Sequence, residues 1–182
     1  IVTVGVHDSN AALVPYFVKG FRRFVVQDSG TWVVTMSPSP EARFTREELG
    51  KEVFFNRSVH GDPVKTTIFR GGAEFDFYRE HVLPGSPHPA DLNLDLLGEI
   101  VAGRRAFSLP TVEPATGLFP DSVARFEGVD TIFRDPATAW CVIDLGLAIQ
   151  GYHAIRLAAG SAPCAVFIEG NIGRNNPVYR SI

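Results

Sequence analysis

Short runs of β-branched and aromatic residues, separated by polar or glycine-containing turns, dominate the first part of the chain. Two such runs, at residues 25–26 and 32–36, flank the polar knuckle from Asp28 to Thr31. This pattern predicts a β-hairpin with Ser29 and Gly30 at its tip. Two further runs flank the turn signal from His60 to Pro63 and predict a second pair of strands.

Helical periodicity dominates the second part of the chain. Apolar residues from Thr138 to Ala159 predict one long helix, and Phe75, Tyr78 and Val82 recur at helical spacing after a glycine turn. The remaining expectations are a strand at 1–6, a helical or coil segment at 9–17 that stops near Pro15, an exposed loop at 37–51, a short helix at 92–101, and strands at 106–110 and 164–170. Together these elements predict an α/β fold with a mixed sheet of about five strands.

Composition and charge exclude several classes of protein. The 182 residues are 45% hydrophobic and 20% charged, which is typical of a globular protein with its own core. A net charge of −3 provides no broad cationic surface, so nucleic acid is not an expected partner. No apolar run reaches the roughly 20 residues that span a bilayer. With only Cys141 and Cys164, neither a disulfide framework nor a zinc site is expected, and reduced thiols in a cytoplasmic protein are the simpler interpretation.

Three small-residue loops lie next to predicted strands: DSGT, RGG and EGNIGRNN. Glycine lets backbone N–H groups approach an anion closely, so each loop is compatible with phosphate binding. Taken alone, each is more typical of an ordinary turn. The sequence contains neither a Walker A sequence nor a strand-linked GxGxxG, which excludes the common P-loop and Rossmann phosphate sites.

Asp8, in the stretch GVHDSNAAL, follows the first predicted strand. A carboxylate at a strand end is well placed to act as a general base on a bound substrate. Aspartate is also among the commonest residues that cap the start of a helix. The local sequence leaves both interpretations open and favours the cap.

The order of HDSNAAL, SGTW, RGG opening a helix, and a long helix leading to a strand with EGNIGRNN resembles the C-terminal domain of the FGGY carbohydrate kinases. Within that family, the chain is most similar to the branch of L-fuculose and L-rhamnulose kinases. The resemblance implies the ribonuclease-H-like fold of the actin, hexokinase and Hsp70 superfamily, with ATP and Mg²⁺ as cofactors. It also implies phosphorylation of a sugar such as a ketose or pentulose.

The resemblance implies roles for individual residues. Asp8 would be the catalytic base that takes the proton from the attacking sugar hydroxyl. The implied nucleotide-binding residues are Ser29, Gly30 and Thr31 at the β- and γ-phosphates, Gly71 and Gly72 near the α-phosphate, and Gly170, Asn171 and Asn175 at adenosine. No side chain is assigned as a metal ligand. Asp28, beside the phosphate glycine, would either repel the triphosphate or support it through hydrated Mg²⁺.

The resemblance also implies a domain organisation. Residues 1–182 are expected to be a C-terminal nucleotide-binding domain, a fragment that lacks an N-terminal domain and a terminal segment and is inactive in isolation. An alternative is a nucleotide-binding or assembly module of the same fold without turnover, and a weaker one is an unrelated α/β domain whose glycines only form turns. The identity of the sugar and the oligomeric state, including a homo-oligomer, stay open.

Overall fold

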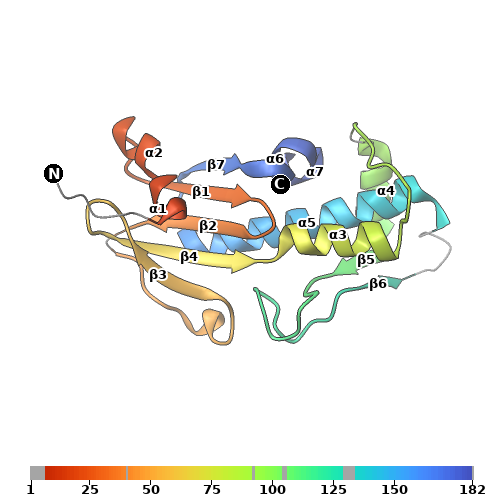
Figure 1. Ribbon diagram of the computed structural model, residues 1–182, viewed down its shortest axis with the longest axis horizontal. Helices are drawn as coiled ribbons and strands as arrows, with labels where there is room; N and C mark the ends of the chain where they lie inside the picture. Colours follow the sequence, from red (N-terminus) through yellow and green to blue (C-terminus); the bar gives the residue numbers. More distant parts are fainter. Residues whose placement is uncertain (1–6, 40, 92, 104–105, 129–133, 182) are drawn as a thin grey trace.

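The computed structural model of the protein describes residues 7–39, 41–91, 93–103, 106–128 and 134–181. Figure 1 shows the arrangement of its helices and strands. The strands are β1 (Phe24–Ser29), β2 (Val33–Pro38), β3 (Val53–Arg57), β4 (Pro63–Phe69), β5 (Ala106–Leu109), β6 (Arg125–Gly128) and β7 (Ala165–Glu169). The helices are α1 (Asp8–Ala11), α2 (Val14–Val18), α3 (Gly71–His81), α4 (Leu94–Gly103), α5 (Pro136–Ala159), α6 (Gly170–Asn175) and α7 (Pro177–Ser181), with a 3₁₀ turn, η1, at Arg46–Glu48.

A five-stranded mixed sheet organises the fold, in the order β3-β4-β2-β1-β7. The strands β1 to β4 pair antiparallel, whereas β7 pairs parallel with β1. Residues 24–27 of β1 are all buried, because helices cover both faces of the sheet at this central strand. The predicted α/β class, the mixed sheet and the hairpin at residues 24–36 are confirmed.

Helix α5 covers one face of the sheet and continues to the second sheet (Figure 1). It begins at Pro136, two residues before the predicted Thr138, because the Asp135 side chain accepts a hydrogen bond from the Thr138 N–H (3.0 Å) and Pro136 occupies the first turn. Buried residues of β2, β4 and α5, namely Val33, Phe69, Ala154 and Leu157, pack together on this face. The predicted long helix is therefore confirmed, and it packs against one face of the five-stranded sheet.

Helices α1 and α2 cover the opposite face. Leu13, at the start of α2, packs with Phe24, Met36 and Val64 of three different strands. The prediction that the segment stops near Pro15 is wrong, because Pro15 lies in the first turn of α2 and needs no N–H partner there. The expected strand at 1–6 lies outside the described residues.

Three local expectations were incomplete. β5 pairs with β6 in a separate two-stranded sheet, and β6 was not predicted because RFEG has no apolar alternation. The segment after β7 was expected to be a loop, but residues 170–175 form helix α6. Glu48, in the expected exposed loop at 37–51, forms a buried ion pair with Lys65 of β4 (2.5 Å).

Candidate functional site

The turn between β1 and β2 packs directly against the start of α3. The Gly72 N–H donates a hydrogen bond to the Thr31 carbonyl oxygen (3.2 Å). A Cβ at Gly72 would lie 2.6 Å from the Gly30 carbonyl oxygen and 2.7 Å from Thr31 Cα, closer than carbon atoms can approach. The glycine at this position therefore allows the first turn of α3 to rest on the hairpin tip.

The start of α6 packs against the same tip from the other side. Gly170 has a φ of +84°, and a Cβ there would lie 2.5 Å from the Ser29 carbonyl oxygen. Ser29 pairs with Gly170 as an isolated parallel bridge, and its Oγ accepts a hydrogen bond from the Gly173 N–H (2.8 Å). The same hydroxyl donates to the Glu169 carbonyl oxygen. Ser29 is buried and joins β1 to α6, so its side chain is part of the frame of the tip.

The three predicted loops therefore meet at the carboxyl end of β1, as Figure 1 shows for the turn after β1 and the starts of α3 and α6. Thr31 and Asp28 are exposed at this end. Backbone N–H groups at the start of a helix such as α3 lack intrahelical acceptors and favour negative charge. The arrangement forms a backbone cradle, defined as residues 29–31, 71–72 and 170, that is suited to an anion.

A cavity of about 300 Å³ lies beside the cradle. Phe75, His88, Asn171, Asn175 and Asn176 line it, together with Ile172. The Asn175 amide donates a hydrogen bond to Asn171 Oδ1 (2.6 Å) across one turn of α6. Aromatic walls combined with a few amide groups suit a planar ligand with polar edges. The structure thus brings Asn171 and Asn175 together with the cradle.

Asp144 on α5 supports this cavity from behind. Its carboxylate oxygens lie 3.0 and 3.1 Å from His88 Nε2, and it accepts a hydrogen bond from Asn176 Nδ2 (2.9 Å). Asn176 Oδ1 in turn accepts from the Tyr179 N–H (2.9 Å) at the start of α7. The hydrogen bond with Asp144 raises the pKa of His88 above its ordinary value, although burial opposes that shift. One carboxylate therefore fixes two walls of the cavity.

Asp144→Ala should lower the free energy of unfolding by about 2 to 4 kcal/mol, because His88 and Asn176 both lose a buried partner. The raised pKa of His88 favours the protonated, ion-paired form in the folded state. Burial raises the pKa of Asp144 as well, so at low pH the carboxyl is protonated and the ion pair is lost there too. Above that range, the stability from the pair is full below the unfolded pKa of histidine and is lost as the pH rises through the raised pKa of His88. Urea unfolding at several pH values should show that the difference in unfolding free energy between Asp144→Ala and the native protein becomes smaller as the pH rises through the raised pKa of His88. Asp121→Ala, at an exposed position, serves as the control. An equal loss of unfolding free energy in both variants would show that Asp144 does not hold His88 and Asn176 in place.

The structure does not bring Asp8 into the cradle. Its side chain is 92% exposed at the start of α1, 2.8 Å from His7 Nδ1, and accepts a hydrogen bond from the Ser9 N–H (2.7 Å). The N-cap residue of α1 is His7, whose Nδ1 also accepts a hydrogen bond from that N–H (3.3 Å). Asp8 is therefore not the N-cap itself but an acidic residue in the first turn of the helix. In Figure 1, α1 lies away from the turn between β1 and β2.

Metal-binding side chains are sparse. Among the described residues, no group of three or more His, Cys, Asp or Glu side chains is arranged to hold a metal ion. Asp28 is a carboxylate at the end of β1 beside the cradle, and a single carboxylate with water and phosphate oxygens is a usual environment for Mg²⁺. Both cysteines are free thiols. The described part of the chain has no helix with the length and apolar character needed to cross a membrane.

Residues 21–182 match the family model of the C-terminal domain of the FGGY carbohydrate kinases. The chain belongs to the FGGY carbohydrate kinase family. The match covers the cradle, the cavity and Asp144, and it confirms the predicted family and its ribonuclease-H-like fold. The predicted L-fuculose and L-rhamnulose branch stays a prediction.

Solved structures of FGGY kinases share the fold. A carbohydrate kinase from Novosphingobium aromaticivorans is 25% identical with a TM-score of 0.71, and the alignment covers 96% of this chain and 38% of that one. A xylulose kinase from Rhodospirillum rubrum is 18% identical (TM-score 0.67; 97% and 35% covered). Plasmodium falciparum glycerol kinase with ADP is 11% identical (TM-score 0.63; 97% and 36% covered). This chain thus spans little more than a third of each relative, and no curated protein sequence matches it significantly.

Sequence reasoning missed several residues of the site. Phe75, His88 and Asn176 line the cavity, and Asp144 holds two of them. His88 lies in a proline-rich stretch and Asp144 in an apolar helix, and 56 residues separate them. No local pattern could have paired them.

Proposed function

We propose that the protein containing this domain is a sugar kinase that phosphorylates a sugar hydroxyl at the expense of ATP. The observation that carries this proposal is the convergence of the Gly30, Gly72 and Gly170 backbones at one end of β1. Family membership supports it, since solved relatives include a xylulose kinase and a glycerol kinase with ADP.

The residues present fit a nucleoside triphosphate. The tip residues Gly30 and Thr31 would contact the β- and γ-phosphates, and Gly71 with Gly72 would contact the α-phosphate through the start of α3. The cavity at Asn171 and Asn175 would take adenosine, with the Phe75 ring as an apolar wall and the polar His88 ring beside it. Gly170 would shape the junction of the two parts.

ATP with Mg²⁺, when bound, supplies the phosphoryl group and neutralises its charge. The chain itself contributes position and proton transfer. The Gly30 and Gly72 N–H groups already donate to the Trp32 and Thr31 carbonyl oxygens, so the Thr31 N–H and hydroxyl would hold the oxygens on which negative charge is stabilised. Asp28 would bind Mg²⁺ through water rather than directly. Asp8 would accept the proton of the attacking hydroxyl, which needs a rigid carboxylate within hydrogen-bond reach of the sugar.

Asp8 lies on an open surface, so we propose that a second domain closes over it and the cradle. Exclusion of water in such a closed cleft strengthens the electrostatic interactions that phosphoryl transfer depends on. The short coverage of the relatives' chains agrees with this organisation. The residues described here should be inactive as an isolated domain. We place the reaction in the cytoplasm, where ATP is available and free thiols persist.

A second candidate is a nucleotide-binding or assembly module that uses the same cradle without turnover. The open position of Asp8 and the negative charge of Asp28 beside the cradle favour it. A coupled assay of ADP release separates the two. The full-length protein should turn over with one member of a panel that contains L-fuculose-type ketoses, L-rhamnulose, xylulose, gluconate and glycerol. ATP binding without sugar-dependent ADP release for any of them would favour the module.

Gly30→Val should weaken ATP binding by about tenfold or more while the melting temperature stays within a few degrees. A Cβ at Gly30 would lie 3.7 Å from its nearest heavy atom, the Trp32 carbonyl oxygen, so the fold has room for it. The added methyl groups would instead occupy the space proposed for the phosphates. Gly98→Val on α4, where a Cβ meets nothing within 4 Å, is the matched control for calorimetric titration. If Gly30→Val binds ATP as tightly as the native protein does, the hairpin tip has no role in ATP binding and serves only as a turn.

A further inference from the structure

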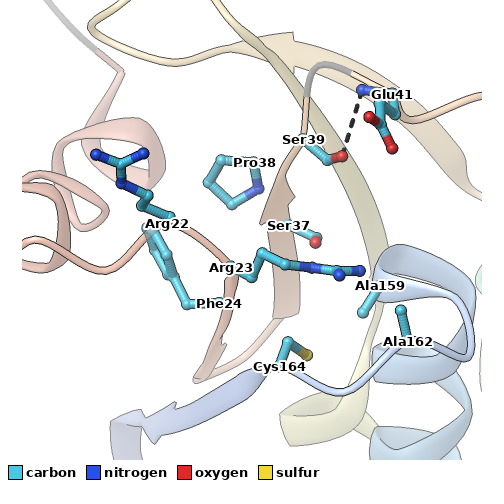
Figure 2. A pocket seen from close by; sticks show the side chains of 10 residues that line it. All are labelled: Arg22, Arg23, Phe24, Ser37, Pro38, Ser39, Glu41, Ala159, Ala162 and Cys164. Atoms are coloured by element: carbon cyan, nitrogen blue, oxygen red, sulfur yellow. Dashed lines mark hydrogen bonds between the residues drawn. The ribbon is translucent and has the colours of Figure 1, made fainter.

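A second cavity of about 300 Å³ opens at the end of the sheet where β1 begins (Figure 2). Its walls come from the segment before β1, the end of β2 and the segment between α5 and β7. The cradle lies at the other end of β1, beyond Ser29. This cavity is therefore separate from the proposed nucleotide site.

Two arginines line this cavity without a partner. The Arg22 and Arg23 side chains make no hydrogen bond or ion pair with any other described residue. Figure 2 shows the Arg23 side chain extended across the cavity, below Ser37 and toward Ala159 and Ala162. Ala159 ends α5, and the partial negative charge of the last carbonyl groups of a helix is too small to neutralise a guanidinium. Figure 2 shows the Arg22 guanidinium directed away from Arg23, so it is the positive charge of Arg23 that faces this solvent-accessible hollow.

Hydroxyl groups add hydrogen-bond donors between the arginines and the opposite rim. Ser37 is 7% exposed, and its hydroxyl has no partner among the described residues. Ser39 Oγ accepts a hydrogen bond from the Glu41 N–H (3.4 Å), which leaves its own proton available. Figure 2 shows the Glu41 carboxylate on this rim, on the other side of the two serines from Arg23. The cavity thus changes from cationic to anionic across its width.

We propose that this cavity binds a small phosphate monoester of a polyol. The planar Arg23 guanidinium can bind two oxygens of a phosphate at once, and the Ser37 and Ser39 hydroxyls complete its hydrogen bonds. The volume exceeds what a bare phosphate needs, and Pro38, Ala159 and Ala162 offer an apolar surface for the carbon chain. The Glu41 carboxylate accepts hydrogen bonds from ligand hydroxyls at the far end. Inorganic phosphate would satisfy only the cationic half.

Calorimetric titration of the full-length protein with glycerol 3-phosphate tests this site. Arg23→Gln should weaken binding by about tenfold, the usual effect of one charge-assisted hydrogen-bonded pair, whereas Arg22→Gln, at the guanidinium that points away, should change it less than twofold. Arg46→Gln, which removes the same charge from the exposed turn η1, should change it less than twofold. Glu41→Gln should act in the opposite direction for inorganic phosphate and strengthen its binding, because a like charge is removed. Arg23→Lys should retain part of the affinity, which shows that the site has not merely unfolded.

Cys164 provides a readout that locates the ligand. It lines this cavity, whereas Cys141 is buried among other core residues. Glycerol 3-phosphate should slow the alkylation of Cys164 by iodoacetamide, measured by mass spectrometry of its peptide, and the protection should disappear in Arg23→Gln. ATP bound at the cradle should not protect Cys164. The proposal fails if glycerol 3-phosphate does not bind at millimolar concentration, if Arg23→Gln binds as tightly as Arg22→Gln and Arg46→Gln, or if Cys164 stays unprotected. If glycerol is the substrate, glycerol 3-phosphate is also the product and binds at the catalytic site, so the loss of affinity in Arg23→Gln and the protection of Cys164, rather than binding alone, assign the ligand to this cavity.

Discussion

In the full-length protein, Asp8→Asn should lower the rate of sugar phosphorylation by about 10² to 10⁴, the usual contribution of a general base. Asparagine keeps the shape of the side chain and removes the oxygen that accepts the proton. The affinity for ATP should stay unchanged, because the Asp8 side chain contacts His7 and Ser9 within the described residues and lies outside the cradle.

Single-turnover kinetics with saturating ATP would measure this effect on the chemical step. Asp121→Asn removes a similar charge at another exposed position and should retain full activity. The fold should also tolerate Asp8→Asn, since His7 rather than Asp8 occupies the N-cap of α1. Full activity of Asp8→Asn would remove this residue from the mechanism and leave it as a favourable charge in the first turn of a helix.

The elements that were predicted from the sequence are those with local signals. The hairpin at β1 and β2 follows from two β-branched runs around a polar knuckle, and α5 follows from the long apolar stretch from Thr138 to Ala159. The parallel pairing joins β1, which precedes the long helix in the sequence, to β7, which follows it. No local pattern specifies such a partner, so the strand order came only from the structure.

The site was predicted in part for a similar reason. The glycines of DSGT, RGG and EGNIGRNN signalled three turns, but only the structure shows that Gly72 and Gly170 touch opposite sides of the same hairpin tip. Helix α6 was missed because GNIGRN combines two glycines with two asparagines, all poor helix formers. Tertiary contacts of Gly173 with Ser29 and Ile168 overcome that weak propensity. His88 and Asp144 likewise have no signal before the chain is folded.

Gly170→Ala should destabilise the protein by about 3 to 5 kcal/mol, because two penalties add at one position. A φ of +84° is unfavourable for any residue with a Cβ, and this Cβ would lie 2.5 to 2.7 Å from backbone atoms of Ser29. Those atoms belong to β1, which is hydrogen-bonded on both sides by β2 and β7 and cannot move alone. The strain should therefore be relieved by displacing α6 from the hairpin tip.

Gly20→Ala is the matched control, because Gly20 has nearly the same φ of +83° and a Cβ there would meet nothing within 4 Å. Its cost should be only the backbone term of about 1 to 2 kcal/mol. Thermal unfolding of both variants would measure the difference, which reports the contact between α6 and β1. At a temperature where Gly170→Ala is still folded, its ATP affinity should fall by at least tenfold, because the cavity at Asn171 moves with α6. Equal stability of the two variants would mean that α6 is not held against the tip, and the cradle would lose one of its three sides.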